Sequence, residues 1–137
     1  MVCTGPENNA PPVPTTIVEG PPPEPIGGTI EPGLYYETAW VRYNGGGGLG
    51  DAGESFMHQQ TTTIDPSLLM SISTTTTEGE PVAYNVQLGS ISPTTVWFWF
   101  VCPAGRAERV GYDVVGRDLT FYFDDTDGPY SYTLSRQ

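Results

Sequence analysis

Short runs in which apolar and polar residues alternate, separated by turn residues, constrain the fold of this chain more than any other feature. A period of two residues places successive side chains on opposite faces of a β-strand, so each run can bury one face. In the run 82–88, for example, every second residue from Val82 to Leu88 is large and apolar. No amphipathic helix of useful length lies between the runs, so we expect an all-β fold.

About eight such runs follow one another at a spacing of roughly 8–12 residues, which is typical of a β-barrel or a β-sandwich. Short turns between consecutive strands favour an antiparallel up-and-down meander. Closure of this meander into a barrel removes the exposed sheet edges, and a two-sheet β-sandwich is the alternative. The runs span residues 34–43, 55–64, 68–77, 82–88, 94–102, 110–115, 119–123 and 130–134.

The N-terminal segment differs in composition from the rest of the chain. The first 32 residues contain nine of the 14 prolines and no basic residue. Such a segment favours extended polyproline II structure and has too few large apolar side chains to form a core. We therefore expect a proline-rich tether or arm over residues 1–26 and a folded β-domain over residues 27–137. Within the arm, Thr15, Thr16, Ile17 and Val18 could add a strand to a neighbouring subunit, which would make a homo-oligomer.

The formal charge of −11 arises from 16 acidic residues against five arginines, with no lysine. A negative, arginine-poor surface repels phosphate groups, which argues against nucleic acid and anionic membranes as partners. The longest apolar run, Val96 to Cys102, is much shorter than the roughly 20 residues that cross a bilayer as a helix. A lipid anchor is the remaining route to a membrane.

Two cysteines, Cys3 and Cys102, leave three alternatives open. Cys3 could carry a lipid anchor, with the proline-rich arm holding the domain away from the membrane. The two cysteines could instead form a disulfide bond, which a secreted protein permits. In the third alternative, Cys102 is an ordinary buried core residue.

The segment Val96 to Val101 is apolar on both faces of the predicted strand. One face can fill the core, so the other face, with Trp97 and Trp99, must be covered by the arm, covered by another chain, or exposed. Exposed aromatic side chains often mark interaction sites. We expect Trp97 and Trp99, together with Trp40 and Tyr43, to contact a ligand or a partner.

The turn at residues 124–128 is acidic and resembles part of a calcium-binding loop, with Asp124, Asp125 and Asp127 as the candidate ligands. Calcium needs about six or more oxygen ligands, and the full loop ends with a glutamate that is absent here. A hairpin turn is therefore the expected structure. Calcium is the one cofactor that the sequence leaves open.

No catalytic constellation can be assembled from the sequence. The single histidine, His58, lies far along the chain from Cys102, and no nucleophile motif surrounds either residue. Zinc requires several nitrogen or sulfur ligands, and these residues lack the usual ligand spacing. Glutamates such as Glu37 and Glu108 are expected at solvated strand ends rather than as an acid and base pair. We therefore expect a protein that is not an enzyme.

Residues 27–36, Gly-Gly-Thr-Ile-Glu-Pro-Gly-Leu-Tyr-Tyr, resemble the opening of the folded part of lipocalin-like small secreted lipoproteins of myxobacteria and related bacteria. The hairpin 112–123 and the final Tyr-x-Leu strand are similar to the end of these proteins, so the matches cover the first and last strands. The resemblance implies a lipocalin-like barrel, with Cys3 as the lipid-anchored residue. It implies a location and an architecture more than an activity.

These observations predict a secreted or lipid-anchored surface domain that binds a small ligand or a partner. The alternative is a structural subunit of a multimer or filament, in which the N-terminal arm packs on a neighbour or adds a strand to it. The expected location is extracellular or in the outer envelope of a bacterium.

Overall fold

The computed structural model describes residues 3–46, 57–76, 79, 81–125 and 128–137 of the chain. Its strands all belong to one sheet, which confirms the all-β prediction. A single 3-10 turn, η1, spans Asn44–Gly46 in the described residues. The strands are β1 (Val13–Ile17), β2 (Gly33–Arg42), β3 (Met57–Ile64), β4 (Leu69–Thr76), β5 (Val82–Ser92), β6 (Thr95–Cys102), β7 (Ala104–Val115), β8 (Asp118–Asp125) and β9 (Gly128–Arg136).

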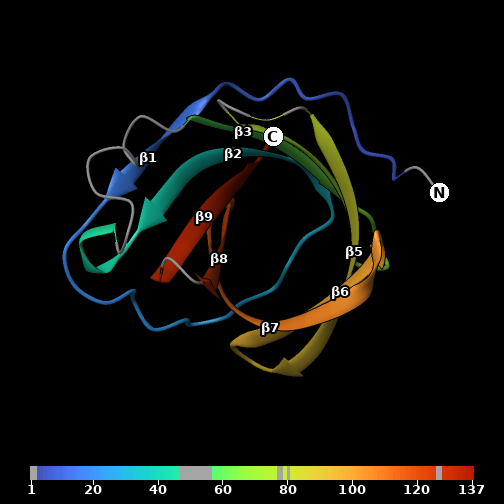
Figure 1. Ribbon diagram of the computed structural model, residues 1–137. Helices are drawn as coiled ribbons and strands as arrows, with labels where there is room; N and C mark the ends of the chain where they lie inside the picture. Colours follow the sequence, from blue (N-terminus) through green and yellow to red (C-terminus); the bar gives the residue numbers. More distant parts are fainter. Residues whose placement is uncertain (1–2, 47–56, 77–78, 80, 126–127) are drawn as a thin grey trace.

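Strands β2 to β9 form a closed antiparallel meander. Each strand pairs with the next one along the chain, and β9 pairs back onto β2, with Trp40 opposite Tyr132. The sheet therefore forms a ring, which Figure 1 shows in a view along its opening. The predicted up-and-down meander is confirmed, and the sandwich alternative does not apply because one continuous sheet contains every strand.

Strand β1, from the proline-rich arm, fills a split between β2 and β3. These two strands pair directly only at one end, where Tyr36 lies opposite Thr61. Further along, Thr15 of β1 pairs with β2 in parallel, and Val13 pairs with β3 in antiparallel. A split in a sheet leaves backbone groups without partners, and β1 supplies those partners.

The segment that could have added a strand to a neighbouring subunit lies in the sheet of its own chain. Residues Thr15, Thr16 and Ile17 belong to β1, and the Val18 amide continues the pairing by donating to the Arg42 carbonyl. Strands β2 and β3 diverge after their short paired stretch, so the unpaired strand edges nearest to β1 belong to its own molecule. β1 therefore pairs with these edges.

The arm before β1 packs on the outer face of β3 and β4. The side chain of Asn8 donates to the Gln59 carbonyl, and the Ala10 amide donates to Thr61 Oγ1. Ser73 Oγ donates to the Pro6 carbonyl. This segment is therefore held against the sheet, which differs from the free, semi-rigid spacer that its prolines predict.

The first residue described, Cys3, is joined to Cys102 at the end of β6 by a disulfide bond that spans 99 residues of sequence. Of the three alternatives for the cysteines, the structure has the disulfide. The sulfur of Cys3 is occupied by this bond, so it does not carry the lipid anchor that the resemblance implies.

The segment after β1 runs round the ring to β7 and then crosses one opening of the ring toward β2 (Figure 1). It meets β7 at Gly27, whose amide donates to the Tyr112 carbonyl and whose carbonyl accepts from Val114. Gly27 has a φ of 76°, and a Cβ there would lie 1.9 Å from the Pro93 carbonyl oxygen, so only glycine fits. Ile30 then packs against the core.

The interior of the ring is filled with apolar side chains from all eight strands of the meander. We call the end crossed by residues 27–32 the floor, and the opposite end, where β2, β4, β6 and β8 finish, the mouth. The most deeply buried apolar side chains lie between the two ends, at mid-height of the ring. These are Tyr35, Ile64, Met70, Val86, Leu88, Val96, Phe98, Val110, Leu119, Phe121 and Leu134.

The disulfide ties the arm across the sheet, so its loss is expected to weaken the fold. A Cys3→Ala/Cys102→Ala double variant is predicted to lose about 2–4 kcal/mol of unfolding free energy, because the unfolded chain regains the entropy of a long loop. Urea denaturation of both proteins without reductant gives this difference. Equal midpoints for the variant and the parent protein would show that the disulfide contributes nothing to stability.

Candidate functional site

A cavity of about 170 Å³ lies inside the ring near the mouth. Six of its lining side chains are aromatic, and they come from β5, β6, β8 and β9. The polar lining groups are few and lie on β3, β4 and β7. The lining consists of Gln60, Ile72, Thr74, Tyr84, Phe98, Phe100, Arg106, Phe123, Tyr130 and Tyr132.

The aromatic lining is one connected array of rings. Phe123 stacks on both Tyr130 and Tyr132, with ring centroids 5.1 and 5.2 Å apart. The ring of Phe98 meets Phe123 edge-on at 5.4 Å. Stacked and edge-to-face rings at these separations are favourable contacts that hold each ring in one orientation. The wall of the cavity is therefore rigid and presents fixed aromatic surfaces to its interior.

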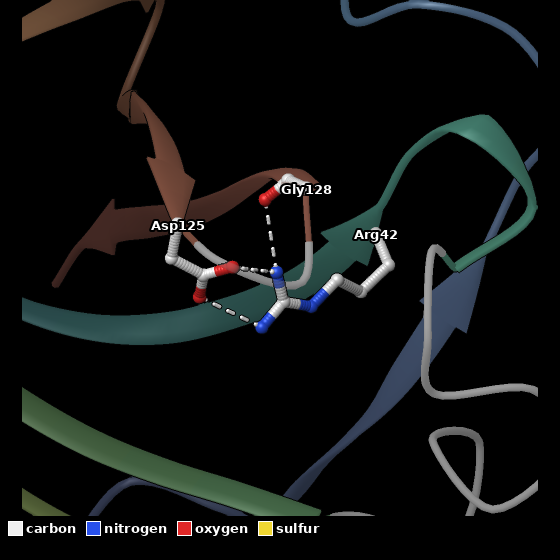
Figure 2. A network of polar contacts seen from close by, with 3 residues as sticks. All are labelled: Arg42, Asp125 and Gly128. Atoms are coloured by element: carbon white, nitrogen blue, oxygen red, sulfur yellow. Dashed lines mark hydrogen bonds and ion pairs between the residues drawn. The ribbon is translucent and has the colours of Figure 1, made fainter.

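An ion pair closes part of the mouth. Arg42, at the end of β2, donates from both terminal nitrogens to the two carboxylate oxygens of Asp125, at 2.8 and 3.0 Å, and also to the Gly128 carbonyl, as Figure 2 shows. The same guanidinium lies over the rings of Trp40 and Tyr130, 4.9 and 4.7 Å from their centroids. Stacking and bidentate pairing together fix this side chain at the rim.

A second arginine lies against the aromatic wall. The Arg106 guanidinium is 4.3 Å from the centroid of Phe100 and pairs with Glu108 at 3.1 Å. Each arginine at the mouth is thus matched by one carboxylate, Arg42 by Asp125 and Arg106 by Glu108.

Trp40 connects the mouth to the inserted arm. Its indole stacks on the imidazole of His58 at 4.3 Å and on Tyr130 at 4.8 Å. His58 Nε2 shares a hydrogen bond with Thr15 Oγ1 of β1. Burial, with a further contribution from Arg42, lowers the pKa of His58 to about 4, so its imidazole is neutral near pH 7.

The most unusual interior residue is Glu37 of β2. Its side chain is only 1% exposed, and its Oε1 atom has no hydrogen-bond partner. Burial raises the pKa of Glu37 to about 8. Burial, with contributions from Tyr130 and from Glu37, also raises the pKa of Tyr132, which hydrogen-bonds to Gln60. Glu37 therefore lies near Tyr132, a lining residue of the cavity, and is held there largely in its neutral form.

One sequence-based expectation about the acids changes as a result. Glu37 lies in the core and is not the solvated strand-end residue that we expected, whereas Glu108 keeps contact with solvent and pairs with the exposed Arg106. The only sequence signal for Glu37 is its place two residues after the inward-facing Tyr35.

The candidate contact residues divide between the two faces of the sheet. Trp99 lies on the outer face of β6 and is 60% exposed, whereas Trp97 is half-buried with Arg109 beside it at 5.8 Å. The arm, which passes over other strands, leaves Trp99 open. Trp40 is an interior residue, and Tyr43 is buried with its hydroxyl bonded to Ser131 Oγ.

The acidic turn is used differently from a calcium loop in the part that the structure describes. Asp125 is engaged by Arg42, Asp124 is exposed, and Asp127 lies outside the described residues. Among the described residues, no group of three or more histidine, cysteine, aspartate or glutamate side chains is arranged to hold a metal ion. Within the same residues there is also no helix with the length and apolar character needed to cross a membrane.

A second cavity, of about 220 Å³, lies at the floor between residues 28–30 and the core. It is lined mainly by apolar groups, and the Tyr112 hydroxyl beside it already donates to the Gly28 carbonyl. The mouth cavity differs because six aromatic rings and a few polar side chains line it, and a buried acid with an unpartnered oxygen lies near its lining residue Tyr132. Ligand sites combine an apolar wall with a few placed polar groups, so the mouth cavity is the better candidate site.

Comparison with known proteins gives no further guide to the site. No protein-family model, no curated protein and no solved structure matches this chain.

The burial of Glu37 predicts how the stability of the protein depends on pH. Because the pKa of Glu37 in the folded chain, about 8, lies above the ordinary value of 4.5, its contribution to stability is complete below pH 4.5 and is lost as the pH rises to 8. Glu37→Gln is therefore expected to stabilise the protein by about 3 kcal/mol at pH 8.5 and to change little at pH 4.

Urea denaturation at both pH values measures the effect, with Glu24→Gln in the exposed arm as the control. If the two variants behave alike at pH 8.5, Glu37 is not a buried neutral acid.

Proposed function

We propose that this protein is a non-enzymatic binding domain that works outside the cytoplasm and holds a small ligand in the mouth cavity. The observation that carries the proposal is the cavity itself, with six aromatic side chains on one wall and Gln60, Thr74 and Arg106 as its polar groups. A closed meander with a site at one end also fits the lipocalin-like architecture implied by the resemblance.

The size of the cavity limits the ligand. An apolar protein cavity of about 150 Å³ is large enough to hold a molecule the size of benzene. The mouth cavity, at about 170 Å³, therefore suits a compact group such as a single ring or a branched alkyl head. Larger ligands could place one such group inside and leave the rest in solvent.

The proposed location rests on the disulfide. Disulfide bonds form and persist in oxidising compartments, and they are rare in the cytosol. The Cys3–Cys102 bond thus supports an extracellular or envelope location, reached without a lipid on Cys3.

Filling the cavity tests the proposal. Thr74 lines the cavity, and Thr74→Phe is expected to remove binding of 3,3-dimethylbutan-1-ol, a neutral probe with a compact branched head, because the new ring occupies its place. Chemical-shift titration by NMR with the full chain is the measurement, and perturbed amides should belong to β4, β6, β8 and β9.

The matched control is Thr16→Phe, the same substitution at an exposed position of β1, which should bind as the parent does. Shift changes centred on Ile30 and Leu68 would place the site at the floor. If the parent protein shows no saturable chemical-shift change, the proposal is wrong.

The second candidate function is self-assembly, and the exposed Trp99 favours it. Trp99 and Val101, which is 44% exposed, form an apolar strip on the outer face of β6. An arm-mediated assembly would need β1 to leave its own sheet, so the outer strip is the more accessible contact. Light scattering after size-exclusion chromatography distinguishes the candidates, and we predict a monomer.

A stable multimer that becomes monomeric in Trp99→Ala would instead favour assembly. Dissociation on deletion of residues 1–18 alone would implicate β1 exchange.

A further inference from the structure

We propose that the ligand of the mouth cavity is a small organic cation, a substituted ammonium whose alkyl head sits against the aromatic wall. This inference rests on the proposed function, since it assigns a chemical class to the occupant of the same cavity. It is drawn from the ring faces, from the balance of charge inside the mouth, and from the place of Glu37.

The aromatic wall already holds cations. The guanidinium of Arg42 lies over Trp40 and Tyr130, and that of Arg106 lies over Phe100. Aromatic faces carry a partial negative charge and attract cations, and cages of such rings are the usual site for substituted ammonium groups. The same array continues inward through Phe123 and Tyr132, and among the described residues no arginine stacks on these two rings.

The charges at the mouth balance except for Glu37. Arg42 is paired with Asp125, and Arg106 with Glu108. Glu37 is left over as a buried acid with an unpartnered oxygen, next to the lining residue Tyr132. A buried carboxylate is costly without a counter-charge. A cation in the cavity supplies that counter-charge, whereas a neutral or anionic ligand does not.

The net charge of the whole molecule also favours a cationic ligand. With a formal charge of −11, the chain repels anions and attracts cations from solution. Arg106 opposes this locally, because it lines the cavity and carries the same sign as the proposed ligand. It therefore becomes a sensitive test of the ligand's charge.

Three probes with the same branched head separate charge from shape. Choline carries a trimethylammonium head, 3,3-dimethylbutan-1-ol is its neutral carbon counterpart, and 3,3-dimethylbutanoate is a related anion. NMR titration of the full chain at pH 8 is expected to show choline binding about tenfold more tightly than the alcohol, which is the range of a desolvated cation–aromatic contact. The anion is expected to bind least.

Two variants assign the preference to residues. Glu37→Gln is expected to reduce choline affinity several-fold and leave the alcohol unchanged, because the buried counter-charge is lost while the aromatic wall and its own attraction for a cation remain. Arg106→Gln is expected to tighten choline binding, because a like charge is removed from the lining. Glu24→Gln, with the same loss of charge in the exposed arm, should match the parent.

Choline affinity should also rise between pH 6 and pH 9, because ionisation of Glu37 favours a cation. The charged and titratable groups around the mouth are His58 on β3, Arg42 on β2, Tyr84 on β5, Arg106 and Glu108 on β7, Asp125 on β8, and Tyr130 and Tyr132 on β9. Of these, His58 has a pKa of about 4 and Tyr130 of about 12, both outside that range.

The outcomes separate this inference from the proposed function. Equal or tighter binding of the alcohol, or loss of binding in Arg106→Gln, would overturn the cationic ligand and leave a binding cavity for neutral or anionic molecules. Failure of all three probes to bind in the cavity would overturn both.

Discussion

The pairing of β9 with β2 is the interaction on which the rest of the structure depends, because it turns a meander into a ring. Closure gives the sheet an inside, so that one face of every strand from β2 to β9 can pack on the others. It also removes the open edges that a meander would otherwise present. The ring has one imperfection, the split between β2 and β3, and the N-terminal arm repairs it with β1. The Cys3–Cys102 bond then joins that arm to the end of β6.

The two ends of the ring differ in composition, and this difference defines the candidate site. Residues 27–32 cross the floor, and Ile30 adds to the packing there. At the mouth the packing changes to aromatic rings with paired charges, and a cavity remains between them. Glu37 lies in the interior with an oxygen that no other group satisfies. Buried polar groups are almost always satisfied in proteins, so this exception calls for a physical explanation. A cationic ligand beside the acid provides one.

Much of the fold follows from sequence periodicity, and the failures have identifiable causes. Alternation located most strands, since one buried face is enough to reveal a period of two. Alternation alone does not reveal that Trp40 and Arg42 face inward, because a bulge between Glu37 and Ala39 shifts the pattern of β2. The start of β7 was also missed, because Arg106 and Glu108 are charged residues that point into the mouth. β1 could not be predicted as part of this sheet, since the split that it fills arises from two strands distant in sequence. The disulfide remained one of three alternatives for the same reason.

The most direct test of this account is to locate a bound ligand's head group. Nuclear Overhauser effects between the methyl protons of choline and the full protein report which side chains lie against it. A choline head group in the mouth cavity should contact the ring protons of Phe98, Phe123 and Tyr132. Contacts confined to Trp99 on the outer face, or to Ile30 at the floor, would contradict this account.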